Sequence, residues 1–338
     1  MSRSFLKSSA KRILTSCVRD ANVRPVALAL VMVASLALGQ RKSTSEFQRT
    51  LPVTNAEPVV LKIEIISGDV EVLYNRDGQV SIAGFAQADG DSGLDDNYFS
   101  ASLTLEQAGN HITLRHSDTG AVQGKIRVRY RIDVPYRTEV VSMVNRGKQS
   151  IRGVLGPVAA KAGIGDIKAS YISRELQAEV ESGNVDLQVI GEHVEARTNR
   201  GNITGERLAQ GINARTGDGD VTLMVVGPST VGVEKGNGRI EVGGARGALT
   251  CSTEGGDLHV QAVPHGDWKL NSASGAIRLD LPPVANFDLD LFADSGQIQF
   301  ERDDLSIPPS DVHRVSQRIG GGGGPIEAHT RSGRITIR

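Results

Sequence analysis

The sequence predicts an all-β protein: a single-stranded β-solenoid (β-helix) with about 18 residues per coil, preceded by an irregular β capping region. Two observations indicate this class. A short glycine phrase returns at a nearly constant step, and apolar residues alternate with polar ones around each copy. The composition agrees, because 39 glycines with only 4% aromatic residues suit many tight turns around small aliphatic side chains.

The repeated phrase consists of a small or polar residue, a glycine, a polar residue and then Val, Ile or Leu. Its glycines are Gly165, Gly183, Gly201, Gly219, Gly238, Gly256, Gly275, Gly296 and Gly333. The steps from Gly165 to Gly275 are 18 or 19 residues, and the last two are 21 and 37, the latter close to two repeats. A constant period over many copies favours stacked coils over hairpins, since each coil buries its apolar face only against its neighbours.

Fixed positions around the glycine carry the apolar residues. Two places after it stand Ile167, Val185, Ile203, Val221, Ile240, Leu258, Ile277, Ile298 and Ile335. Five places before it stand Ala160, Ala178, Ala196, Ala214, Val233, Cys251, Leu270, Leu291 and Ala328. We predict that both columns point inward. The glycine is predicted to form the corner of each coil, and the following Asp or Asn, as in Asp166 and Asn184, to bond nearby backbone.

Residues 1–39 are predicted to be a signal peptide or a membrane anchor. Basic residues precede an apolar run of about 13 residues, Val26 to Leu38, which is short for a spanning helix and typical of a signal-peptide core. Ala37-Leu38-Gly39 offers small residues for cleavage, and an uncleaved anchor at residues 25–39 is the alternative. We therefore expect an exported protein of the periplasm or cell envelope, with membrane contact only through this segment.

Residues 40–140 are predicted to be the N-terminal β capping region, because their strand signals are irregularly spaced and a bare end coil would be an open edge. Residues 141–338 are predicted to hold the β-solenoid repeats. The register around Gly147 is unclear, since Ile151 fits the aliphatic column only if two residues are inserted. The polar stretch 303–325, with its glycine run, is predicted to be a loop interrupting the last two coils.

Charge and motifs exclude several classes of function. A net charge of −1 gives no field for nucleic acid, and no nucleophile-elbow, Walker or dinucleotide-binding motif occurs. Cys17 would leave with the signal peptide, and Cys251 lies in an inward column, where we expect a buried apolar filler. Trp268 is predicted to fill the core of its coil or to stand as a lone exposed aromatic.

The sequence predicts no metal site. Four carboxylates (Asp89, Asp91, Asp95 and Asp96) crowd one loop, but their spacing does not match an EF-hand. The run from Thr216 to Asp220 resembles part of a calcium-binding β-roll repeat, yet only one turn per coil carries it. Seven histidines lack ligand spacing and are expected on the surface: His111, His116, His193, His259, His265, His313 and His329. We predict no catalytic residue, no cofactor and no metal.

The outward positions carry charges of both signs, which fits either a soluble face or a binding face. Sugar-cleaving β-helices place their carboxylates among long loops, whereas the coils between Gly165 and Gly275 are close to minimal. A pocket is therefore expected only near the N-terminal region or the 303–325 loop.

Several phrases together resemble a known family. They are SGDV, SGNV, RGNI and DGDV, the strand ending Ile132-Asp133-Val134-Pro135, the late glycine-rich loop and the terminal SGRITIR. They resemble the bacterial putative-adhesin family, a β-helical domain of unknown function on exported or membrane-anchored proteins. The resemblance covers roughly residues 45–338 and implies the architecture, but no catalytic residues.

Our leading hypothesis is a non-enzymatic, exported cell-envelope β-solenoid that offers an adhesin or scaffold surface to a cell-surface protein or glycan. One alternative is a self-assembling structural β-helix polymer, in which an exposed C-terminal coil ending in Arg338 would stack end to end. The less favoured alternative is a polysaccharide-active β-helix enzyme.

Overall fold

The computed structural model describes residues 43–54, 57–88, 94, 97–117, 125–233, 238–302, 304–305 and 312–338. These residues are almost entirely β, with a single short helix among them, α2 (Tyr98–Ser102). The predicted all-β class is confirmed. Within these ranges no helix has the length and apolar character needed to cross a membrane. The predictions for residues 1–39 and for the four carboxylates between 89 and 96 fall outside the described residues.

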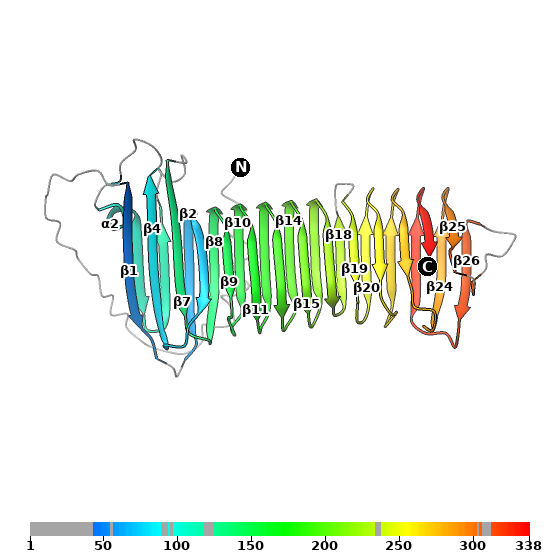
Figure 1. The fold of residues 1–338 in the computed structure, drawn as a ribbon, viewed down its shortest axis with the longest axis horizontal. Coiled ribbons are helices and arrows are strands. Elements are labelled where there is room, and N and C mark those ends of the chain that lie inside the picture. The colour runs from blue at the N-terminus through cyan, green and yellow to red at the C-terminus, as the bar shows by residue number, and fades with distance from the viewer. Residues whose placement is uncertain are drawn as a thin grey trace. The chain divides into compact units, whose positions relative to one another are not determined.

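The described strands form two fourteen-stranded sheets, and from β8 to β25 the chain alternates between them (Figure 1). Sheet 1 contains, in spatial order, β1 (Thr44–Pro52), β4 (Gln79–Ala88), β7 (Ile126–Val134), β3 (Asp69–Tyr74), β9 (Gln149–Arg152), β11 (Ile167–Ile172), β13 (Val185–Ile190), β15 (Ile203–Leu208), β17 (Val221–Val226), β19 (Ile240–Gly243), β21 (Leu258–Gln261), β23 (Ile277–Asp280), β28 (Arg334–Ile337) and β25 (Gln297–Phe300). Sheet 2 contains β26 (Arg314–Ile319), β24 (Phe287–Ala293), β27 (Pro325–Thr330), β22 (Trp268–Ser272), β20 (Leu249–Thr253), β18 (Ser229–Val233), β16 (Ile212–Asp218), β14 (Val194–Arg200), β12 (Leu176–Ser182), β10 (Val158–Ile164), β8 (Thr138–Arg146), β2 (Val59–Ser67), β6 (His111–His116) and β5 (Leu103–Ala108).

Equal positions of successive copies pair with each other in long parallel ladders. Ile167 pairs with Val185, Val185 with Ile203, and Ile203 with Val221. In sheet 2, Ala160 pairs with Ala178 in the same way. Such in-register parallel stacking is what a β-solenoid requires, because each coil then covers the apolar face of the next.

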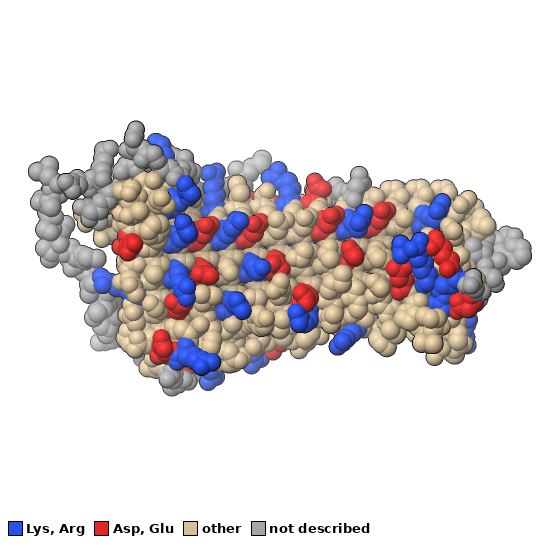
Figure 2. Space-filling model, viewed as in Figure 1, with Lys and Arg blue, Asp and Glu red and all other residues tan. Residues whose placement is uncertain are grey.

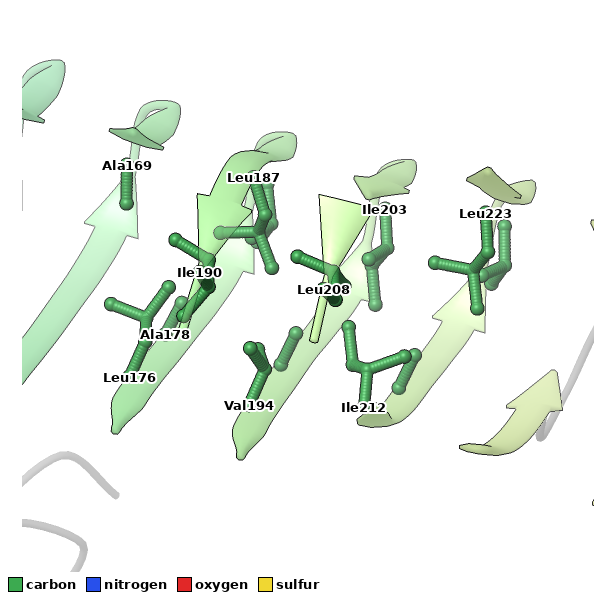
Figure 3. Packing of buried hydrophobic residues seen from close by; sticks show 14 of the residues in the cluster. Ala169, Leu176, Ala178, Leu187, Ile190, Val194, Ile203, Leu208, Ile212 and Leu223 are labelled. Atoms are coloured by element: carbon green, nitrogen blue, oxygen red, sulfur yellow. The ribbon is translucent and has the colours of Figure 1, made fainter. Parts of the chain in front are cut away.

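The core lies between the two sheets and is filled by the predicted columns. Every residue two places after a corner glycine is at most 3% exposed. Figure 3 shows side chains of both sheets, among them Leu176, Leu187 and Ile203, lying side by side in this layer. Branched aliphatic residues dominate it because they pack well on a pleated surface.

One member of the other column is wrong. The repeat predicts Val233 beside Ala214, but the structure pairs Ala214 with Val231, which is 1% exposed and pairs in turn with Cys251. The copy before Gly238 is longer than its neighbours, and the extra residues lie after the strand rather than before it. Val231 stands seven places before Gly238, so a count of five places back from the glycine falls two places short.

Gly147 begins a regular copy, and no residues are inserted after it. Gln149, not Ile151, takes the column position between Val70 and Ile167. Gln149 is 1% exposed, and its Nε2 donates a hydrogen bond of 2.7 Å to the carbonyl oxygen of Lys161. Because of that bond, the Gln149 amide can be buried at a position where the sequence pattern predicts an aliphatic side chain.

The corner glycines stack directly on one another. A Cβ on Gly183 would overlap the carbonyl oxygen of Gly165, and a Cβ on Gly165 would overlap that of Gly147. Gly147 is related in the same way to Gly68, so the early phrase at Gly68 is the neighbouring corner despite its distance in sequence. Close backbone approach, added to a φ near +145°, is thus the reason for glycine at the corner.

Where an Asp or Asn follows the corner glycine, its side chain ties one coil to the next. Asp166 Oδ1 accepts the backbone N–H of Asn184 at 3.0 Å, and Asn184 Oδ1 accepts that of Asn202 at 2.9 Å. The predicted bonding to nearby backbone is therefore a bond to the adjacent coil, which is near in space and 18 residues away in sequence. Each bond satisfies a corner N–H that has no place in a strand ladder.

At the N-terminal end, β2 and β3 pair in parallel with β8 and β9 and so continue both sheets. The end strands run the other way: β4 is antiparallel to β7 and β1, and β5 is antiparallel to β6. Because the end strands are antiparallel, no strand of the parallel repeat is left at the edge for another chain to pair with.

At the C-terminal end the chain doubles back. β27 lies between β22 and β24, and β28 lies between β23 and β25. The coil ending in Arg338 is therefore internal, and the expectation that it is an exposed end coil is wrong. A strand inserted between two others, as β27 and β28 are, forms backbone hydrogen bonds on both sides, whereas a strand at the end of a sheet forms them on one side.

The predicted 303–325 loop also contains a strand. β26 runs antiparallel to β24 and buries Val315 and Ile319. Its alternation of apolar and polar residues is too short to be distinguished from a polar loop by sequence pattern alone.

The first prediction concerns the corners. Gly183→Ala should lower the free energy of unfolding by about 3 kcal/mol, because its Cβ would overlap the Gly165 carbonyl in a stack that cannot shift locally. Gly109→Ala is the matched control, since Gly109 also has positive φ but nothing within 4 Å of a Cβ, and should cost about 1 kcal/mol. Urea unfolding followed by circular dichroism measures both. Equal losses for the two variants would contradict the stacked corner.

Candidate functional site

The outer face of sheet 1 carries one ladder of side chains that crosses all fourteen strands, called here the outward row. In spatial order it consists of Gln48, Ala83, Arg131, Glu71, Ser150, Lys168, Asp186, Thr204, Thr222, Glu241, His259, Arg278, Thr336 and Gln299. Neighbouring members are one strand apart, roughly 4.8 Å. Figure 2 shows acidic and basic residues interleaved along the face in view.

Charges on the outer faces pair with opposite charges on the next coil. Lys168 Nζ lies 2.9 Å from Asp186 Oδ2 on sheet 1, and Lys161 Nζ lies 2.6 Å from Glu179 Oε2 on sheet 2. Exposed pairs of this kind add little stability. They do give a surface with both signs close together, which favours no single sign of charge in a partner.

The larger hollow, called here the N-terminal hollow, lies on the outer face of β1, β4, β7, β3 and β9 and encloses about 670 Å³. It exists because Ala83 is small, while Gln48 and Arg131 on the flanking strands are large. Its position near the N-terminal region agrees with the prediction from coil length.

The walls of this hollow combine an aromatic ring with charges of both signs. The guanidinium carbon of Arg129 lies 5.9 Å from the centre of the Phe85 ring. Asp69 Oδ1 accepts the backbone N–H of Lys148 at 2.9 Å. The charged lining residues are Glu46, Asp69, Glu71, Arg129, Arg131 and Lys148. Hydrogen-bond donors and acceptors beside an apolar ring suit a polar ligand with a flat face. The residues that line the hollow include no Ser–His or Cys–His pair for covalent catalysis.

A second hollow, called here the arch hollow, encloses about 460 Å³ and is lined by Gly244, Gln261, Ala262, Val263, Asp280, Leu281, Pro282 and Arg338. The sequence did not predict it, because it lies beside coils that are close to minimal. It results from Gly244 and Ala262, which are small where the preceding coil carries the exposed Val225.

A charged cluster borders the arch hollow. Asp280 accepts hydrogen bonds from Arg278 Nε at 2.9 Å and contacts His259 Nε2 at 2.7 Å. Burial opposes ionisation of Asp280, but the bonds from Arg278 and His259 outweigh it and hold the pKa of the carboxyl below its usual value. A lowered pKa keeps this carboxyl charged at neutral pH, so it is poorly suited to act as a general acid.

The other candidates from the sequence have structural roles. Thr216 is buried and donates from Oγ1 to the carbonyl oxygen of Gly201 at 3.0 Å, and Asp220 Oδ1 accepts the N–H of Arg239 at 2.8 Å. Both bonds join coils, as at the other corners. Among the described residues no group of three or more His, Cys, Asp or Glu side chains could hold a metal ion.

Trp268 and Cys251 fill the core. Trp268 is fully buried, and its Nε1 donates to the carbonyl oxygen of Gly247 at 3.1 Å. Burial raises the pKa of the Cys251 thiol to about 12, which leaves it unreactive as a nucleophile.

One histidine departs from the expected surface role. His116 is 1% exposed, contacts the rings of Tyr98 and Tyr130, and lies 3.1 Å from Ser102 Oγ. The alternation in β6 already places Ile112, Leu114 and His116 on one face, and that face is the buried one. A lack of ligand spacing does not by itself put a histidine on the surface.

A family model described as Toastrack DUF4097 matches residues 100–338, which is most of the chain. The chain belongs to the Toastrack DUF4097 family. This match confirms the resemblance to a putative-adhesin family of unknown function. The matched residues of this Toastrack domain include β5 to β28, and so contain the whole run of parallel coils from β8 onward.

Solved structures show distant likenesses to this Toastrack chain. A putative adhesin from Bacteroides fragilis has 12% identity and a TM-score of 0.35, covering 86% of this chain and 95% of that one. A putative lipid binding protein from Parabacteroides distasonis has 11% identity and a TM-score of 0.36, covering 87% and 97%. A putative cell adhesion protein from Clostridium sporogenes has 10% identity and a TM-score of 0.26, covering 87% and 98%. No curated protein matches the chain.

The second prediction follows from Asp280. Its folded pKa is below the unfolded value, so its contribution to stability is present above the unfolded pKa and is lost as the pH falls through the folded one. Asp280→Asn should therefore lower the urea midpoint most near neutral pH, and the difference from wild type should shrink as the pH falls below the ordinary aspartate pKa of about 3.9. If the urea midpoints of the variant and wild type differ by the same amount at every pH, the charge of Asp280 does not contribute to stability.

Proposed function

We propose that this Toastrack protein is an exported, non-enzymatic β-solenoid of the cell envelope that presents an adhesion or scaffold surface. In this proposal the coils hold about 18 residues each and the N-terminal region caps them. Export rests on the signal-like or anchor-like segment within residues 1–39. The observation that carries the proposal is the outward row, an uninterrupted flat ladder with a hollow at its N-terminal end.

We place the contact with the partner at the N-terminal hollow and take the partner to be a cell-surface glycan. The volume lies within the range of small-ligand sites. Phe85 offers a ring beside the flat guanidinium of Arg129, and sugar hydroxyls can both donate to carboxylates such as Glu71 and accept from Arg131. A cell-surface protein is the alternative partner.

The shifted carboxyls support a role without catalysis. Glycoside hydrolysis needs one carboxyl whose pKa is raised, so that it can donate a proton. At Glu64, burial opposes ionisation, but hydrogen bonds from Lys62 and Arg115 hold the pKa below its usual value. The pKa values of Asp280 and Asp304 are lowered too, so all three shifted carboxyls stay ionised.

The third prediction tests the hollow. Purified protein is applied to a glycan array and to envelope extracts in a pull-down. Phe85→Ala and Arg131→Ala should each weaken glycan binding about tenfold or more, because they remove the ring and a donor. Thr222→Ala is the matched control, since it changes the same row on a central coil far from the hollow, and should leave binding unchanged.

Three outcomes would contradict the proposal. Binding that survives both hollow variants would exclude this site, provided that circular dichroism shows the variants folded. Turnover of a polysaccharide that is lost on replacing one carboxylate would favour the enzymatic alternative. Filaments in electron micrographs of the purified protein, without glycan binding, would favour the polymer.

A further inference from the structure

In six consecutive coils, the residue six places after the corner glycine has a left-handed backbone conformation. This arch row consists of Gly153, Tyr171, Val189, Arg207, Val225 and Gly244, with φ between +54° and +77°. The residues on either side pair in register, as Ser170 does with Gln188 and Ile172 with Ile190, so the arch residues stack one above another.

The four central members are unexpected at this backbone position. Left-handed φ is disfavoured for L-residues, and most of all for β-branched ones such as Val189 and Val225. Gly153 and Gly244 adopt the same conformation at the two ends of the row, so the fold itself needs no side chain there.

Burial does not compensate for this strain. Tyr171 is 53% exposed and Val225 41% exposed, and the neighbouring Met224 is 39% exposed. The Arg207 side chain is 62% exposed. Strained residues persist where something outside the local backbone makes use of them. The Tyr171 ring lies 5.3 Å from the guanidinium carbon of Arg152 in the same chain, and the rest of its surface, like that of Val225, faces solvent.

The row is complementary to itself when turned end for end. With a two-fold axis at Arg207, Val189 of one copy faces Val225 of the other, and Tyr171 faces Gly244. Gly244 has no side chain and lines the arch hollow, so a tyrosine ring has a place to enter. The arch residues are spaced by one strand, roughly 4.8 Å, in both copies, so all the facing pairs can form together.

The charges at the axis also fit this arrangement. Within one copy, Arg207 Nη2 lies 2.6 Å from Glu206 Oε1, and both side chains remain substantially exposed. A two-fold axis through this pair brings the Arg207 of each copy beside the Glu206 of the other, so opposite charges meet. Tyr, Met and Arg are also the side chains enriched in protein interfaces.

We propose that the arch row is the interface of a two-fold symmetric dimer, in which Tyr171 of each copy enters the arch hollow beside Gly244 of the other. The partner is thus a second copy of this chain, docked side by side along the row. The surface is separate from the N-terminal hollow, so dimerisation and glycan binding can fail independently.

The fourth prediction is tested by sedimentation velocity on the full-length chain over a wide range of protein concentration. Wild type should sediment as a dimer at the higher concentrations. Arg207→Glu and Glu206→Arg should each weaken association at least tenfold, because each places like charges at the axis. The double variant Glu206→Arg with Arg207→Glu should restore the dimer, since it exchanges the two charges.

Tyr171→Gly separates the interface from folding. It should also give a monomer, while its thermal unfolding midpoint stays equal to wild type or rises, because glycine relieves the left-handed strain. Thr222→Glu, on the outward row, is the control and should leave the dimer intact. A wild type that is monomeric throughout overturns the proposal. Association that survives both single charge changes overturns it too, since it would then run through another part of the chain.

Discussion

The whole arrangement depends on how closely the corners of neighbouring coils approach. At each regular corner, the carbonyl oxygen of one glycine occupies the space that a Cβ on the next would need, as Gly165 does for Gly183. This contact fixes the register, since one strand ends and the next begins at that point. The bond from the N–H of Asn184 to Asp166 then holds the same corner on its outer side. Both inward columns and the outward row follow from this one constraint.

Much of the fold could be predicted because the corner is local in sequence. The residue two places after each glycine is always separated from it by the same turn, so the column from Ile167 to Ile335 was read correctly. Positions counted across a variable stretch were not: Val231, rather than Val233, stacks on Ala214. Gln149 was missed because its hydrogen bond to Lys161 joins two strands and leaves no pattern in the sequence.

The ends and the candidate sites depend on non-local pairing. A step of 37 residues is compatible with two further coils or with a return of the chain, and only the pairing of β28 with both β23 and β25 distinguishes them. The hollows result from a small residue among larger neighbours, Ala83 in one case and Gly244 in the other. The size of those neighbours depends on which strands pair, and the local sequence does not give it. The left-handed Val189 could not be predicted at all, since a β-branched residue normally argues against that backbone.

Stacking of equal positions in adjacent coils is tested most directly by disulfide trapping in a background carrying Cys17→Ser and Cys251→Ala. Thr204 and Thr222 pair across β15 and β17, at about 4.8 Å, a separation that a disulfide can bridge. Asp186 and Thr222 are two coils apart, at about 10 Å, beyond disulfide reach. Under mild oxidation, mass spectrometry should find the bridge in the variant with cysteines at 204 and 222 and not in the variant with cysteines at 186 and 222. Equal bridging in both, or none in the first, would contradict the account.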